Sequence, residues 1–177
     1  YMLFDYKVFP NKTSFYYEVE NDNEMIGQGE SQEVKLKNKS GDVHFNYSVT
    51  NPHNDIMAFI IIIVFNPFIK NNIIFNFPVS ERFIKDLKKI KRFETIKING
   101  PIKNYPKFHG KNISIPKGGG LDSAALMCLF PDSYLYHQIG KEIVNVNLLA
   151  EKCNCKYPVT IIDSNIMSIA CDISCFD

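Results

Sequence analysis

Apolar and polar residues alternate with a period of two in three segments of the first half of the chain. These segments are residues 15–20, 33–37 and 43–49. Their alternation predicts strands with one solvated face. Residues 38–42 are of the types that tight turns favour, which predicts a hairpin between the second and third segments. The continuous apolar run at 56–65 and the segment 73–77 are predicted to continue the sheet as further strands.

An amphipathic helix is predicted to follow, over residues 81 to about 92, with Ser80 as its cap. Its apolar stripe consists of Phe83, Ile84, Leu87 and Ile90. Basic residues gather near its carboxyl end, and we interpret them as a solvated helix face rather than a polyanion site. A strand at 95–98 and turn residues at 99–101 come next, which places a module boundary near residue 100.

Beyond this boundary the pattern alternates between strand and helix. Strands are predicted at 112–115, 133–138 and 159–163, and helices at 122–129 and 144–153. Such alternation indicates a parallel sheet, whose ligands lie outside the carboxyl ends of the strands. We therefore predict a β-rich α+β module with one helix over residues 1–100, and an α/β parallel-sheet unit over 101–177.

The charge balance limits the classes of partner. A formal net charge of +1 provides no long-range attraction to nucleic acid or to an anionic membrane, so we expect neither as a partner. The ten-residue apolar run at 56–65 is about half of what a membrane-spanning helix needs. With no secretion signal recognised, we expect a cytoplasmic protein. Because Tyr1 is not methionine, we also expect a fragment, a processed product or a trimmed chain.

The chain has five cysteines, which are Cys128, Cys153, Cys155, Cys171 and Cys175. An odd number without a secretion signal favours reduced thiols. The last four could in principle hold zinc or an iron–sulfur cluster. Their C-x-C spacing is tighter than that of usual zinc sites, so we predict ordinary thiols and no metal at these positions.

A glycine segment carries the clearest chemical signal. The strand at 112–115 runs into Lys117, then Gly118, Gly119 and Gly120, and a helix is expected to start around Asp122. Glycines let phosphate oxygens approach the backbone, and free N–H groups at a helix start favour an anion. The segment matches neither the Walker loop nor the dinucleotide fingerprint. A plain strand-to-helix connection is the alternative interpretation.

The stretch Gly118-Gly119-Gly120-Leu121-Asp122-Ser123 resembles the signature of the PP-loop ATP pyrophosphatases, Ser-Gly-Gly-x-Asp-Ser. The departure is Gly118, which stands where the family has serine. The strong resemblance covers about a dozen residues and extends weakly over roughly 60 residues of the alternating pattern. A complete domain of this family normally has further strands and helices, so we expect either a partial protein or a minimal relative.

The resemblance implies a HUP/Rossmann-like nucleotide-binding unit over residues 101–177, which is expected to be incomplete. It also implies Mg-ATP as cofactor, an acceptor that attacks the α-phosphate, and release of pyrophosphate. It assigns the phosphate contacts to the loop from Gly118 to Ser123, with Asp122 and Ser123 as catalytic residues. Asp122 can cap the helix or hold Mg²⁺, and Ser123 adds a hydroxyl donor. Position alone makes His137, Gln138 and residues 163–165, which begin with Asp163, candidates for adenine contacts. His137 is interpreted first as a structural histidine, and Asp163 as a turn residue or a ligand contact.

Three functions therefore remain open. The chain is an ATP-dependent adenylating enzyme, a nucleotide- or anion-binding module without turnover, or an interaction protein whose glycine segment is only a connection. The expected partners are ATP and an unidentified acceptor, and self-association is left open. The acceptor cannot be inferred from these residues.

Overall fold

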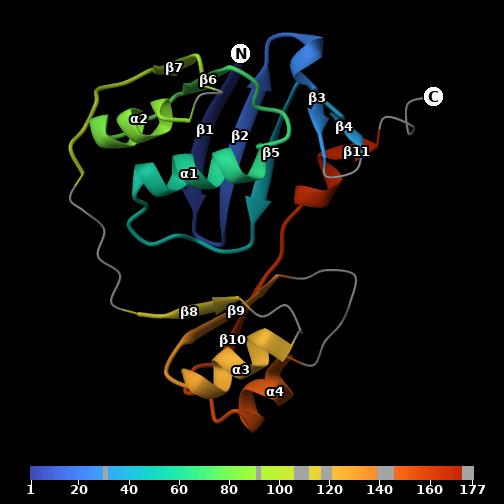
Figure 1. Cartoon of the computed structure of the whole chain (residues 1–177), viewed down its shortest axis with the longest axis vertical. Helices are drawn as coiled ribbons and strands as arrows, with labels where there is room; N and C mark the ends of the chain where they lie inside the picture. The colour runs from blue at the N-terminus through green and yellow to red at the C-terminus, as the bar shows by residue number, and fades with distance from the viewer. Residues whose placement is uncertain (30–31, 91–92, 106–111, 117–120, 139–145, 173–177) are drawn as a thin grey trace. The chain divides into compact units, whose positions relative to one another are not determined.

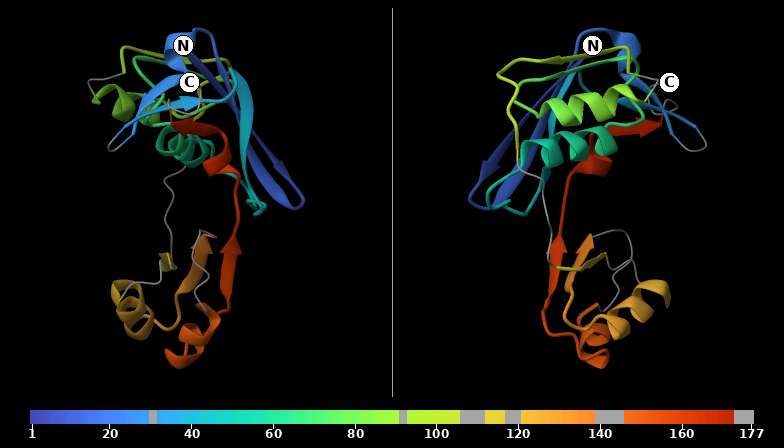
Figure 2. Two further views of the ribbon diagram at one scale, coloured as in Figure 1. Left: turned by 90° about the vertical axis from the view of Figure 1, so that its right-hand side faces the viewer. Right: turned by 60° about the vertical axis from the view of Figure 1, so that its left-hand side comes forward.

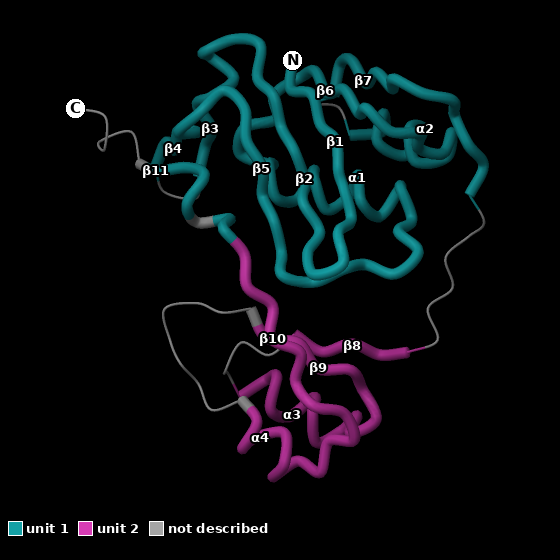
Figure 3. Tube along the Cα trace, turned by 180° about the vertical axis from the view of Figure 1, so that it is seen from behind, with its two compact units in different colours: residues 1–106, 165–177 teal, residues 107–164 magenta. Residues whose placement is uncertain are grey.

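The computed structural model describes residues 1–29, 32–90, 93–105, 112–116, 121–138 and 146–172. The chain divides into two compact units, shown in Figure 3 in teal and magenta. Unit 1 contains Tyr1–Pro106 together with Asn165–Asp177, and unit 2 contains Lys107–Ser164. The carboxyl-terminal segment thus belongs to the same unit as the amino terminus.

Unit 1 is built on a five-stranded sheet with the order β5-β2-β1-β6-β7 (Figure 1). Its strands are β1 (Met2–Phe9), β2 (Lys12–Val19), β5 (Ser40–Phe45), β6 (Asn72–Phe75) and β7 (Thr95–Ile98). The first three are antiparallel neighbours, and β6 and β7 continue the sheet in parallel with β1. From β1, the strands β2 and β5 extend the sheet toward one edge. The later strands β6 and β7 extend it toward the other edge.

Two helices cover one face of this sheet (Figure 2). They are α1 (Asn54–Val64), which precedes β6, and α2 (Glu81–Lys88), which precedes β7. The core between helices and sheet contains a cluster of aromatic rings, with Phe4 lying 5.1 Å from Phe65 and 6.4 Å from Phe75 between ring centroids. All three rings are fully buried. The prediction of a capped helix after Ser80 is confirmed, since the Ser80 hydroxyl accepts a hydrogen bond from the Phe83 backbone.

The prediction of a buried strand at 56–65 is wrong, because this run forms most of α1. The helix buries Met57, Ala58, Ile61 and Ile62. These positions share one helical face, while Phe59 and Ile63 remain 56% and 58% exposed. Burial against the sheet therefore outweighs the strand preference of consecutive isoleucines. None of the described helices is long and apolar enough to cross a membrane.

The predicted hairpin between residues 33–37 and 43–49 is also wrong. The first of these segments forms β4 (Glu33–Leu36), which lies in a separate antiparallel sheet with the order β11-β4-β3. Its partners are β3 (Ile26–Gln28) and β11 (Ala170–Asp172), and short 3-10 turns, η1 (Asp22–Glu24) and η2 (Ile166–Ser168), precede them. The predicted turn residues lie directly before β5 and at its start, but β5 pairs with β2. The local turn residues therefore do not determine which strand β5 pairs with.

Unit 2 contains a three-stranded parallel sheet with the order β10-β9-β8 and two helices. The strands are β8 (Ser114–Pro116), β9 (Tyr134–Gln138) and β10 (Val159–Ile162), and the helices are α3 (Leu121–Leu129) and α4 (Val146–Lys152). Its core consists of Ile115, Met127, Leu135, Ala150, Cys153 and Val159. Both helices overlap the predicted ones.

The predicted fold class is nevertheless wrong. Across the described residues the chain is a mixed α+β protein with several small sheets, rather than a β-rich module followed by a HUP/Rossmann-like unit. The described strands of unit 2 have three, five and four residues. Their spatial order follows the chain order without reversal, so they do not form the switch point that characterises a doubly wound sheet. Local alternation of strand and helix is too weak a signal to specify that architecture.

Candidate phosphate-binding site

The glycine segment lies between a strand and a helix, an arrangement that is common at phosphate-binding sites. Gly118, Gly119 and Gly120 lie outside the described residues, as does Lys117. On either side, β8 ends at Pro116 and α3 begins at Leu121, so four residues connect a strand to a helix. The predicted strand before the segment and the predicted helix after it are therefore both present.

The first turn of α3 is accessible from solvent. Leu121 is 85% exposed, Asp122 is exposed and Ser123 is half-buried. The first N–H groups of a helix have no partners within the helix, and the helix dipole favours a negative charge at this end. Among the described residues, Leu121 and Asp122 at the start of α3 are therefore accessible to a ligand from solvent.

The carboxyl ends of the other two strands lie at the same edge of the sheet. In the parallel register Pro116 pairs with Tyr136, and Gln138 at the end of β9 pairs with Ile162 at the end of β10. His137 pairs with Ile161, two positions beyond the buried pair of Leu135 and Val159, and so lies on the same face of the sheet as that pair. His137 is half-buried. The structure thus brings His137 to the sheet edge at which α3 begins.

Asp163 and Ser164 follow β10 at this edge. The Ser164 backbone N–H donates to the Asp163 carboxylate at 2.8 Å, which is the turn geometry that the residue types indicate. Asp163 is exposed. Asn165 belongs to unit 1, where its side-chain amide bonds the backbone of β5. Its Oδ1 accepts from His44 N at 2.8 Å, and its Nδ2 donates to Asp42 O at 2.9 Å.

The Asp122 carboxylate, at the start of α3, could hold Mg²⁺ together with phosphate oxygens. Mg²⁺ in nucleotide sites is usually held by one or two carboxylates, water and phosphate oxygens. Asp122, in the first turn of α3, is a carboxylate of that kind. Within the described part of the chain, no group of three or more His, Cys, Asp or Glu residues could hold a metal by itself. Asp122 alone would therefore hold such an ion only together with ligands from outside the described residues.

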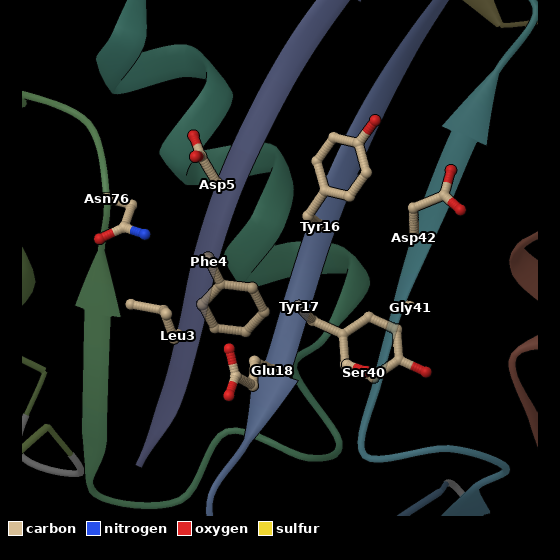
Figure 4. A pocket seen from close by; sticks show the side chains of 10 residues that line it. All are labelled: Leu3, Phe4, Asp5, Tyr16, Tyr17, Glu18, Ser40, Gly41, Asp42 and Asn76. Atoms are coloured by element: carbon tan, nitrogen blue, oxygen red, sulfur yellow. The ribbon is translucent and has the colours of Figure 1, made fainter.

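The surface of unit 1 has a hollow that the sequence did not predict. It is a shallow depression of about 400 Å³ on the five-stranded sheet, and its wall includes carboxylates from Asp5, Glu18 and Asp42 (Figure 4). Asp5 pairs with Tyr16 in the strand register, and Tyr16 pairs with Asp42. The alternation of residues 2–9, which marks β1, is the signal that could have revealed it. Negative charge makes this depression unsuited to phosphate.

The two outer carboxylates of the depression cannot share a metal ion. Asp5 and Asp42 lie two strands apart, which is about 10 Å at the usual strand spacing. The Asp42 Oδ2 atom lies 3.1 Å from the His44 Nδ1 atom instead. The hollow is therefore a polar depression in which the Asp5 and Asp42 carboxylates do not converge as metal ligands would.

Comparisons with known proteins leave the site to be judged by its own geometry. No family model matches the chain. No curated protein and no solved structure is significantly similar to it either.

Proposed function

We propose that this chain binds Mg-ATP through residues 118–123 and adenylates an acceptor with release of pyrophosphate. The observation that carries the proposal is the position of the glycine segment, between the carboxyl end of β8 and the first turn of α3. His137 and Asp163 at the same sheet edge support it, because an adenosine group bound there would lie beside them. Gly118, Gly119 and Gly120 support it through the resemblance of their sequence to the PP-loop signature.

The proposed reaction is an attack of an acceptor oxygen on the α-phosphorus of ATP. The bond between the α-phosphorus and its bridging oxygen breaks, and pyrophosphate leaves with the electron pair. Negative charge accumulates on the leaving group, so donors at the start of α3 would stabilise the transition state. Ser123 would donate its hydroxyl hydrogen to a phosphate oxygen, and Asp122 would share Mg²⁺ with the phosphates.

A second candidate is nucleotide binding without turnover, and Gly118 favours it. The related signature has serine at this position, whereas glycine has no side-chain donor. Losing one donor weakens the stabilisation of developing charge more than it weakens binding, if the donor acts mainly in the transition state. The two candidates share the binding site and differ in whether pyrophosphate is released.

Competition binding tests the shared part of the proposal. A fluorescent ATP analogue is bound in the presence of Mg²⁺ and displaced with ATP, pyrophosphate or AMP. A site for the β- and γ-phosphates predicts that pyrophosphate displaces the analogue and that AMP does so at least tenfold less well. Equal displacement by AMP and pyrophosphate would contradict a phosphate site at this loop.

Ser123→Ala supplies the residue-level test. Loss of a hydrogen bond to a charged phosphate is expected to weaken ATP binding about tenfold. Ser114→Ala is the matched control, because Ser114 is an exposed serine at the opposite end of β8. Equal affinities of the two variants would remove Ser123 from the site.

A further inference from the structure

Three cysteines gather where the carboxyl ends of the two helices of unit 2 meet. Cys128 lies in the last turn of α3, and Cys153 and Cys155 follow the end of α4. The sulfur atoms of Cys128 and Cys153 lie 2.8 Å apart, and the two are not joined by a disulfide bond. A disulfide bond is about 2.05 Å long, so a movement of under about 1 Å would bring the two sulfurs to bonding distance.

The end of α4 explains how this arrangement arises from a C-x-C sequence. Asn154, between the two cysteines, has a φ of 52° in the left-handed region. Its N–H bonds Glu151 O at 3.0 Å, and the Cys155 N–H bonds Ala150 O at 2.9 Å. This is the Schellman pattern that ends many helices. The reversal presents Cys153 and Cys155 toward α3.

The three thiols differ in access to solvent. Cys128 is exposed, Cys153 is buried and Cys155 is half-buried. The Cys153 sulfur lies 3.9 Å from Ala124 O, one turn before Cys128 on α3, and the Cys155 sulfur lies 3.9 Å from Met127 O. An external reagent therefore reaches Cys128 first, while Cys153 is positioned to attack a modified Cys128 from inside the protein.

We propose that Cys128 and Cys153 form a reversible disulfide on exposure to a low-molecular-weight disulfide. The Cys128 thiolate attacks one sulfur of the reagent and releases one reagent thiol, leaving a mixed disulfide on Cys128. The Cys153 thiolate then attacks the Cys128 sulfur and releases the second reagent thiol. Two protein thiols are oxidised, one reagent disulfide is reduced to two thiols, and a reducing dithiol reverses the change.

Cys155 is the less suitable partner for Cys128. Burial, and then the neighbouring Cys128, raise the pKa of the Cys155 thiol above its usual value. The thiolate is the attacking species in disulfide exchange, so this shift makes Cys155 less reactive at neutral pH than an ordinary thiol. The sulfur contact of 2.8 Å joins Cys128 to Cys153. This inference does not depend on nucleotide binding.

Peptide mapping of the full chain tests the inference. The reduced protein is incubated with oxidised glutathione, quenched with acid, alkylated and digested without reduction. The expected product is a peptide pair linked through Cys128 and Cys153 that disappears after treatment with dithiothreitol. Links from Cys128 to Cys155, Cys171 or Cys175, or no link at all, would overturn it.

Two variants separate reactivity from a fold defect, with circular dichroism checking that each remains folded. Cys155→Ser is the matched control and should give the same linked pair as the wild type. Cys153→Ser removes the resolving thiol and should leave glutathione attached to Cys128. A Cys153→Ser protein in which Cys128 stays unmodified would show that Cys128 is not the accessible thiol, and would also overturn the inference.

Discussion

Ser80 donates two hydrogen bonds to the carboxylate of Asp55, one from its backbone N–H at 2.8 Å and one from its hydroxyl at 2.6 Å. The same hydroxyl oxygen accepts from Phe83 N at 3.0 Å and caps α2. Ser80 therefore caps the start of α2 and links it by hydrogen bonds to Asp55 in the first turn of α1. Ser80 is buried, so water cannot replace these bonds without rearrangement.

Ser80→Ala is expected to destabilise unit 1 by about 1–3 kcal/mol, because it removes a helix cap and a hydrogen bond to a charged group. Urea unfolding followed by far-ultraviolet circular dichroism measures the change. Ser40→Ala is the control, because Ser40 is an exposed serine at the start of β5. A loss no larger than that of Ser40→Ala would show that the bonds to Asp55 contribute nothing measurable.

Two isoleucines on α1 distinguish a helix from the strand that the sequence suggested. Ile61 is fully buried and Ile63 is 58% exposed. In a helix these positions point in different directions, whereas in a strand they would share a face. Ile61→Ala is expected to cost about 2–5 kcal/mol of unfolding free energy. Ile63→Ala should stay within about 0.5 kcal/mol of the wild type. Similar losses for both variants would contradict the helix.

Asn154 is expected to tolerate glycine and to resist β-branched residues. Its φ of 52° suits asparagine and glycine, but brings the Cβ of most other residues too close to the backbone. Asn154→Val should destabilise unit 2 by about 1–3 kcal/mol, whereas Asn154→Gly should change it by less than about 1 kcal/mol. Thermal unfolding of both variants measures the difference, and equal melting temperatures would argue against the helix cap.

Alkaline pH is expected to weaken unit 1 through its buried tyrosines. Burial, and then Asp42, raise the pKa of Tyr17 above its usual value of about 10. The fold therefore favours the neutral phenol, and this contribution is complete below pH 10 and is lost as pH rises through the folded-state pKa. Unfolding free energy measured from pH 8 to 11 should fall, and the fall should be shallower in Tyr17→Phe. An unchanged slope in the variant would rule out Tyr17 as a source.

The sequence was informative where a local interaction determines the structure. Ser80 as a helix cap and the strand-to-helix frame of the glycine segment follow from neighbouring residues, and both are present. The identity of α1 depended on what its apolar side chains pack against, which a run of isoleucines cannot reveal. The bond between Ser80 and Asp55 joins residues 25 positions apart and has no local signature.

Long-range pairing also explains the errors in sheet assignment and fold class. β4 pairs with β11, from the opposite end of the chain, rather than with the strand that follows it. Within the candidate site, the sequence placed His137 and Asp163 at the carboxyl ends of β9 and β10 because parallel strands end at one edge. The bonds of Asn165 to the backbone of β5 join residues more than 100 positions apart and have no local signature.

Titration calorimetry with Mg-ATP is the most direct test of the proposed site. It compares the wild type with Gly119→Asp, which adds a side chain and a negative charge to the glycine segment, and with Ser114→Asp, which adds the same charge at the amino end of β8. The account predicts saturable binding that persists in Ser114→Asp and is lost in a folded Gly119→Asp. Binding that survives Gly119→Asp unchanged, or no binding of the wild type at millimolar nucleotide, would contradict it.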